Sequence, residues 1–213
     1  MSQAMAEHAA EQSIQGKVDP IFGTASHGKL GMWIFLLTDG MGFAGLLIAL
    51  GIVRTAAPVW PPNPEVDHLG IPFTAIMTFI LICSSVTMVL ALSGAQEGNR
   101  KALVGWLSAT VLGGLFFLCG QVYEYSHLIR EGFTLSADHM SSTFYVITSY
   151  HGAHVLTGVI YLSVVLVKSL KAPLTKSHAS FVEVAGLFWH FVDLVWILVF
   201  TIVYLIPSNP GVH

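Results

Sequence analysis

Long apolar runs separated by short polar segments dominate the chain. Five of these runs reach the ~20 residues that a helix needs to cross about 30 Å of hydrocarbon. They cover residues 30–53, 71–92, 102–125, 143–167 and 181–206. The connections contain Gly, Pro and charged residues and are too short to hold a soluble domain. The pattern therefore predicts an all-α, polytopic membrane bundle of five transmembrane helices.

Composition narrows the class of protein further. Of the 213 residues, 54% are hydrophobic and only 10% are charged, which excludes an ordinary water-soluble domain. A net charge of -3 and the absence of a basic run argue against a nucleic-acid partner. We expect an N-terminal tail over residues 1–29, a membrane domain over 30–206 and a short tail over 207–213. The first tail lacks a continuous apolar core, so we do not expect it to be a cleaved signal peptide.

Basic residues predict how the helices are oriented. Seven of the nine Lys and Arg residues fall in the N-terminal tail and in the second and fourth loops. The remaining two, Arg54 and Arg130, fall in the first and third loops. Because Lys and Arg accumulate on the cytoplasmic side, we expect a cytoplasmic N-terminus and a periplasmic C-terminus.

Several polar residues lie inside the predicted spans, where an unpaired charge is costly. We expect them to face other protein, in structural, proton-related or lipid-related roles. They are Asp39, Gln121, Glu124, His151, His154, Glu183, His190 and Asp193.

The last span carries the clearest polar pattern. Glu183, Gly186, His190 and Asp193 follow one another at intervals of three, four and three residues, which places them on one side of a helix. Such a stripe is typical of a surface that faces the inside of a bundle. We expect the His190 imidazole and the Asp193 carboxyl to hydrogen-bond to each other.

The third span contains a second pattern. Phe117, Gln121 and Glu124 lie four and three residues apart and therefore share one helical face. Glu124 and His127 also form a Glu-x-x-His sequence, a spacing that can supply two ligands to a di-iron site. A di-iron bundle carries that motif on two of its helices, whereas the second Glu-x-x-His of this chain, Glu65 to His68, lies in the loop between the first two spans.

The fourth span carries His151 and His154, three residues apart. Two histidines at this spacing can bind a metal, or they can hydrogen-bond to neighbouring helices. Both lie near the expected depth of Glu124, so a contact with that carboxyl is one alternative.

The first span places Asp39 beside Gly40, Gly42 and Gly45. Small residues let helices approach closely, so Asp39 can fix a helix contact or belong to a proton or lipid-headgroup site. Cys83 and Cys119 lie within the spans without a Cys-x-x-Cys spacing, and we expect buried core thiols.

Taken together, these segments resemble subunit III of the haem-copper respiratory oxidases. The resemblance covers nearly the whole chain after the tail. It rests on the order and spacing of four pieces: Trp60-Pro61-Pro62-Asn63-Pro64, Gln121 with Glu124-Tyr125, Thr143-Phe144-Tyr145 leading to His151-Gly152-Ala153-His154-Val155, and Trp189-His190-Phe191-Val192-Asp193-Leu194-Val195-Trp196.

The resemblance implies a non-catalytic subunit of a proton-pumping cytochrome c oxidase in a bacterial inner membrane. It implies no cofactor in this chain, with haem and copper held by partner subunits. It also implies packing against subunit I, with subunit II and a small subunit IV nearby, and it is compatible with a bound phospholipid. Cytochrome c or quinol would bind to other subunits, and a quinol oxidase is the alternative complex.

Two departures from the family pattern qualify the site residues. The acid that is commonly Glu in the first matching helix is Asp39 here, which argues against a direct proton relay. Many members have seven spans, and the first span of this chain corresponds to their third. In shortened members, helices of subunit I can occupy the place of the two missing spans. The chain would then supply only one wall of the family's lipid-filled cleft, with Asp39 and His151 as candidate lipid contacts.

Two other classes of protein remain open. The first is a stand-alone metalloenzyme that uses some of Glu124, His127, His151, His154, His190 and Asp193 as ligands. The second is a proton or small-solute transporter, which the intramembrane acids would allow. The sequence lacks the repeated, interrupted helices of many transporters.

Overall fold

The computed structural model describes residues 27–56, 70–136, 139–171 and 175–205. The helices in these ranges are α2 (His27–Ala56), α3 (Ile71–Gln96), α4 (Arg100–Arg130), α5 (His139–Lys171) and α6 (Lys176–Phe200). A π-helical segment, η2 (Thr201–Leu205), follows α6 directly. Five helices are long and apolar enough to cross a membrane, which confirms the predicted all-helical membrane fold. Each α-helix extends past its apolar run at one end or both, and the last run, 181–206, ends in η2, with residue 206 outside the described residues.

Local sequence signals explain where these helices begin and end. Asn99 caps α4 by accepting a hydrogen bond from the Ala102 amide at 3.2 Å, and Thr175 caps α6 through the His178 amide at 3.2 Å. Gly98 and Gly132 follow α3 and α4 with φ angles of 72° and 85°. This left-handed conformation suits glycine, so both positions turn the chain back toward the bundle.

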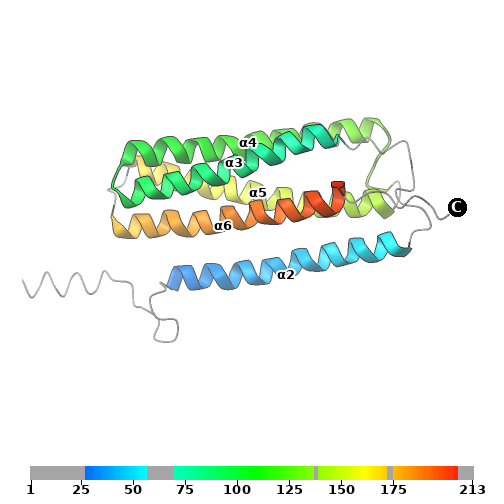
Figure 1. Cartoon of the computed structure of the whole chain (residues 1–213), viewed down its shortest axis with the longest axis horizontal. Coiled ribbons are helices and arrows are strands. Elements are labelled where there is room, and N and C mark those ends of the chain that lie inside the picture. Colours follow the sequence, from blue (N-terminus) through cyan, green and yellow to red (C-terminus); the bar gives the residue numbers. More distant parts are fainter. Residues whose placement is uncertain (1–26, 57–69, 137–138, 172–174, 206–213) are drawn as a thin grey trace, which may run out of the picture. The chain divides into compact units, whose positions relative to one another are not determined.

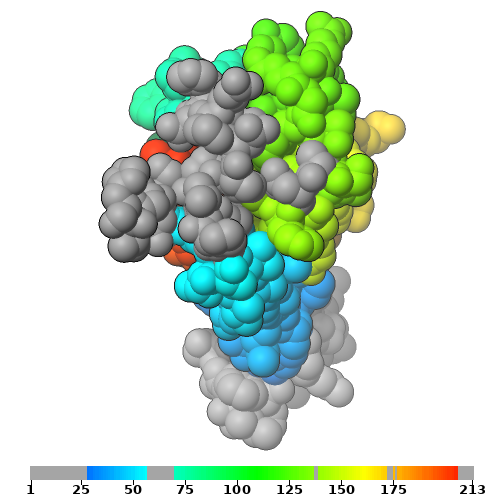
Figure 2. Space-filling model, turned by 90° about the vertical axis from the view of Figure 1, so that its right-hand side faces the viewer, coloured from blue at the N-terminus to red at the C-terminus, as the bar shows by residue number. Residues whose placement is uncertain are grey.

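The chain divides at Asp39 into two compact units. Residues 27–39 of α2 are the described part of the first unit. The second unit contains the rest of α2 and the four helices α3 to α6, which run side by side (Figure 1). Figure 2 looks at the end of this unit where α4 connects to α5, in green.

The contacts between α3 and α4 show that the two helices are antiparallel. Added Cβ atoms at Gly94, Gly113 and Gly120 would meet Leu103, Ser84 and Met77 respectively. Gly94 is on α3, whereas Gly113 and Gly120 are on α4. Contacts nearer the C-terminal end of α3 lie nearer the N-terminal end of α4, as antiparallel helices require. The glycines let the two backbones approach closely along the whole pair. The bundle is therefore held at its α3–α4 interface by small residues spaced along both helices.

Two tryptophans of α6 form the centre of the core. Trp189 and Trp196 are almost fully buried, and their indole nitrogens donate to Ser84 Oγ at 3.0 Å and Thr78 Oγ1 at 2.9 Å on α3. A Cβ atom at Gly158 on α5 would lie 2.9 Å from the Trp189 ring. The ring therefore occupies space that only a glycine leaves open.

The structure tests two sequence expectations about packing. Phe117, Gln121 and Glu124 are all buried, which confirms the shared inward face of α4. Cys83 and Cys119 are exposed on α3 and α4, so the expectation of core thiols was wrong. Along each helix, buried and exposed positions alternate every few residues, and both thiols lie on the exposed side.

The glycines expected to bring a helix close to α2 behave differently. A Cβ added at Gly40 would lie 3.6 Å from the Phe191 ring, and one at Gly42 would lie 3.4 Å from the Tyr150 hydroxyl. Nothing lies within 4 Å of a Cβ at Gly45. Aromatic side chains, and not a helix backbone, therefore occupy the space beside the first two glycines.

Candidate functional site

The polar stripe of α6 faces α3. A Cβ at Gly186 would lie 3.2 Å from Met88, and one turn later His190 Nδ1 lies 2.5 Å from the Ser85 hydroxyl. Asp193 follows on the same side and is 4% exposed. The predicted bundle-facing position of the stripe is thus correct for these residues.

The predicted hydrogen bond between His190 and Asp193 was wrong. The His190 imidazole bonds to Ser85, and neither carboxyl oxygen of Asp193 has a hydrogen-bond partner among the described residues. Residues three apart on a helix share a side, but their side chains need not converge. A hydroxyl from the neighbouring helix reaches the imidazole instead.

Glu124 lies at the centre of a polar cluster that joins three elements. Its carboxylate accepts a hydrogen bond from Thr74 Oγ1 of α3 at 2.8 Å. Tyr204 of η2 donates to the two carboxylate oxygens at 3.3 Å each. Because the side chain is only 6% exposed, these donors replace water around the carboxyl. Glu124 therefore serves as a buried acceptor that faces other protein, as expected from the sequence.

Gln121 forms a second cluster one turn earlier on α4. Its Nε2 donates to the Thr148 carbonyl of α5 at 2.8 Å and to the Tyr125 hydroxyl at 3.1 Å. The Tyr125 hydroxyl also bonds to Thr148 Oγ1 at 2.6 Å. A Cβ at Gly152 would lie 2.5 Å from Gln121 Oε1, so the amide fits only against a glycine.

His151 and His154 turn toward different neighbours. His151 is fully buried between the rings of Phe117 and Trp196, and its Nε2 donates to the Val192 carbonyl of α6 at 3.1 Å. His154 Nδ1 bonds within its own helix to the Tyr150 carbonyl at 2.7 Å. For His151 the structure shows the hydrogen bond to a neighbouring helix that the sequence allowed. The contact with Glu124, the other alternative, is not formed among the described residues.

His154 instead belongs to an aromatic cluster with the second half of α2. The Phe43 ring lies 5.2 Å from the His154 ring and 4.8 Å from the Tyr150 ring, measured between centroids. It also approaches Phe191 of α6 at 6.5 Å. Phe43 is therefore one of the side chains through which residues 40–56 pack on α5 and α6.

The potential metal ligands do not converge. Glu124 is buried, whereas His127 lies on the surface with its Nδ1 3.4 Å from Glu131 Oε1. Over the described ranges, no three His, Cys, Asp or Glu side chains come together in a group that could hold a metal ion. The Glu-x-x-His sequence therefore supplies no paired ligands here.

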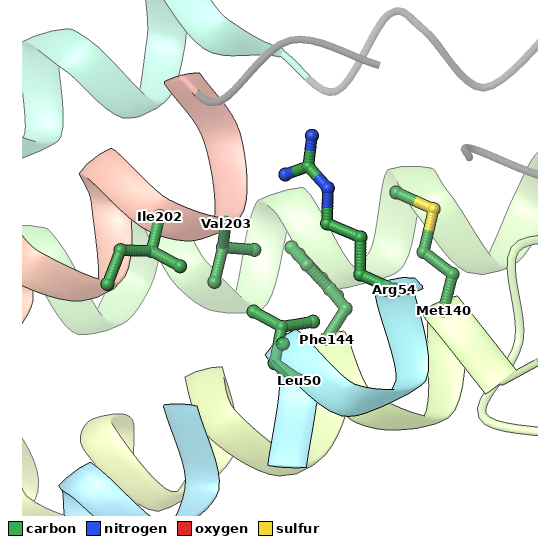
Figure 3. A pocket seen from close by; sticks show the side chains of 7 residues that line it. Leu50, Arg54, Met140, Phe144, Ile202 and Val203 are labelled. Atoms are coloured by element: carbon green, nitrogen blue, oxygen red, sulfur yellow. The ribbon is translucent and has the colours of Figure 1, made fainter. Parts of the chain in front are cut away.

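An apolar pocket lies where the end of α2 meets α5 and η2 (Figure 3). Its volume is about 110 Å³, and its lining is Leu50, Gly51, Arg54, Met140, Phe144, Ile202 and Val203. In Figure 3 the Arg54 guanidinium extends away from the Leu50 and Phe144 side chains. The lining offers hydrocarbon contacts and one cation, and it contains no acid, base or nucleophile that could form a catalytic group with Arg54.

The family of the chain follows from comparison with known proteins. A family model described as cytochrome c oxidase subunit III matches residues 1–208. The chain belongs to this family. The match confirms the resemblance that the Trp189–Trp196 run and the other motifs indicated.

Curated subunit III relatives match most of the chain. Cytochrome c oxidase subunit 3 of Alkalihalophilus pseudofirmus is 37% identical over 203 residues, which cover 89% of this chain and 97% of the relative. Cytochrome c oxidase subunit 3 of Corynebacterium diphtheriae is 37% identical over 182 residues, covering 84% and 87%. Cytochrome bo(3) ubiquinol oxidase subunit 3 of Pseudomonas putida is 34% identical over 177 residues, covering 83% and 84%. The chain is therefore a multi-pass membrane subunit III of the haem-copper oxidases, which are oxidoreductase complexes.

Several residues that shape this subunit III interior were missed by sequence reasoning. Ser85 and Thr74 lie on α3, whose sequence shows little polar periodicity, and together with Tyr204 of η2 they supply partners to His190 and Glu124. The contact of Tyr204 with Glu124 could have been predicted, because a Tyr hydroxyl near the end of the last span lies at the membrane depth expected for Glu124. Asp39 and Glu183 remain predicted structural, proton-related or lipid-related positions.

Proposed function

We propose that this subunit III is a non-catalytic part of a proton-pumping cytochrome c oxidase in a bacterial inner membrane. It packs against subunit I, where it stabilises the complex and supports proton uptake, with subunit II and a small subunit IV as further neighbours. Haem and copper belong to the partner subunits. The observation that carries this proposal is the use of Gln121, Glu124, His151 and His190 in hydrogen bonds that join helices.

These hydrogen bonds leave the polar groups in scaffold positions. Gln121 and His151 bond to main-chain carbonyls on neighbouring helices, and Glu124 accepts from two hydroxyls. These contacts use the polar groups to join neighbouring helices. Such networks stabilise one packing of the helices, which is what a supporting subunit requires.

Deletion of this chain from the oxidase tests the proposal. We expect the purified complex to retain its haem and copper spectrum while losing activity faster during turnover and pumping fewer protons. Re-expression of the chain provides the control and should restore both properties. Loss of the haem or copper signal in stoichiometric amount on deletion would contradict the non-catalytic role.

The electron donor requires its own experiment. Names of relatives include both cytochrome c oxidase and ubiquinol oxidase subunits, and we favour cytochrome c from the Trp60-Pro61-Pro62 loop. That loop lies outside the described residues. The isolated complex should oxidise reduced cytochrome c faster than ubiquinol or menaquinol. Faster oxidation of a quinol would overturn the choice of donor and leave the subunit III role intact.

A further inference from the structure

Asp193 differs from the other buried acid of the bundle. Glu124 accepts hydrogen bonds from Thr74 and Tyr204, whereas both carboxyl oxygens of Asp193 lack a hydrogen-bond partner among the described residues. Asp193 is also 4% exposed and lies within a membrane-spanning helix, so bulk water does not solvate the carboxyl. A buried carboxylate without donors or a cation costs several kcal/mol, and a carboxyl in such a place becomes neutral instead.

The surroundings of Asp193 contain imidazoles but no ion pair. His190 lies one turn earlier on α6, and His151 of α5 bonds to the carbonyl of the preceding residue, Val192. In the part of the chain that the structure describes, neither imidazole forms an ion pair with Asp193. Each imidazole instead forms a hydrogen bond with another group: His190 with the Ser85 hydroxyl, and His151 with the Val192 carbonyl.

Ser85 connects the acid to His190. Its hydroxyl is 2.5 Å from His190 Nδ1, and the same side chain lies near the Asp193 carboxyl but outside hydrogen-bond geometry. A hydroxyl has one proton to donate and two lone pairs to accept with. If Ser85 donates to Nδ1, its oxygen remains available to accept a proton from a second group.

We propose that Asp193 is a neutral carboxylic acid whose hydroxyl donates to Ser85 Oγ, while Ser85 donates to His190 Nδ1. The terminal torsion of an Asp side chain is broad, so the carboxyl can rotate to make this hydrogen bond to Ser85. Because His190 accepts at Nδ1, its own ring proton is on Nε2. The three side chains thus link α3 to α6 without any charge inside the membrane. This inference does not depend on the proposed function, since it concerns only the protonation of groups within the chain.

Infrared spectroscopy of the purified oxidase complex tests the protonation directly. A neutral carboxylic acid has a carbonyl band separate from the amide bands, and this band shifts in heavy water. We expect the wild-type complex to show such a band and Asp193→Asn to lack it. Ser85→Ala should retain the band at higher frequency, because the acid loses its hydrogen-bond acceptor. Glu124→Gln is the matched control and should leave this band in place. Identical wild-type and Asp193→Asn spectra in this region would overturn the proposal.

The thermal stability of the complex gives a second, independent measurement. The amide of Asn can donate to Ser85 Oγ as the neutral acid does, so Asp193→Asn should melt close to the wild-type complex. Asp193→Leu has similar bulk but no donor, and it should melt at a lower temperature. An Asn variant that loses as much stability as the Leu variant would show that the charge of an ionised Asp193 is needed, which contradicts the proposal.

Discussion

Gly152 illustrates how a single residue governs a polar contact in this bundle. The Gln121 amide occupies the space of the missing side chain and reaches the Thr148 carbonyl through it. The glycine therefore has a packing role that its position in a helix does not reveal, because helix interiors normally disfavour glycine.

Gly152→Ala should destabilise the protein. The added Cβ would lie 2.5 Å from Gln121 Oε1 and 3.0 Å from Nε2, so the amide must move and lose its bond to Thr148. Overpacking of this kind typically costs about 1–3 kcal/mol. Thermal unfolding of the complex checks the change. Gly105→Ala is the control, because nothing lies within 4 Å of its Cβ, and it should cause no loss of stability. Equal stability of the two variants would contradict the packing role.

At the scale of elements, two hydroxyls of α3 accept hydrogen bonds from the two buried tryptophans of α6. Ser84 and Thr78 each donate their own proton to a carbonyl of α3 and accept an indole N–H from α6. The hydroxyl oxygens thus satisfy two tryptophans that would otherwise be buried with unpaired donors.

Ser84→Ala should weaken the α3–α6 interface. The Trp189 indole would lose its acceptor, and an unsatisfied buried donor typically costs about 1–3 kcal/mol. Chemical unfolding followed by tryptophan fluorescence measures this loss. Ser108→Ala provides the matched control, because Ser108 bonds only to the Val104 carbonyl of its own helix. A similar small effect from both variants would show that the indole bond contributes little.

The end of α6 depends on Glu124 through Tyr204. Tyr204→Phe removes the donor to both carboxylate oxygens and should raise amide hydrogen exchange over residues 201–205. The expected loss is about 1 kcal/mol, the usual net contribution of one hydrogen bond. Tyr123→Phe is the control, because Tyr123 is exposed and contacts Phe73 through its ring. Unchanged exchange in Tyr204→Phe would indicate that apolar packing alone holds η2.

Sequence periodicity predicted faces of single helices well, and it could not predict which side chains meet across helices. Phe117, Gln121 and Glu124 were placed correctly on the inner face of α4, because spacing within one helix fixes its sides. The partner of His190 was missed, since Ser85 is 105 positions away and an isolated Ser carries no periodic signal. The exposed thiols were misplaced for a related reason, because both faces of a membrane helix are apolar.

At the scale of the whole molecule, basic residues gather at one end of the bundle. Arg100 Nη1 donates to the Leu170 carbonyl at 3.5 Å, and Lys168 Nζ lies 4.4 Å above the Phe181 ring. These contacts bring the start of α4, the end of α5 and the start of α6 together. The positive-inside rule then predicts that this end faces the cytoplasm.

Protease sites inserted into the two turns test that orientation. A site inserted after Gly98, at the basic end, should be cut only in inverted vesicles, where the cytoplasmic side is accessible. A site inserted after Gly132, at the opposite end of α4, should be cut only in right-side-out vesicles. Both turns are exposed in the structure. The reverse pattern of cleavage would mean that the N-terminus is periplasmic.

Cys83 and Cys119 are exposed on α3 and α4, so their chemical modification can report whether a partner subunit covers these helices. A lipid-soluble maleimide would modify a thiol that faces hydrocarbon, and a thiol covered by a neighbouring subunit would escape modification. Comparing the free chain with the intact oxidase would therefore map how much of these two surfaces a partner covers, without an engineered probe. The residues that were misplaced from the sequence thus become natural footprinting sites for the quaternary contact.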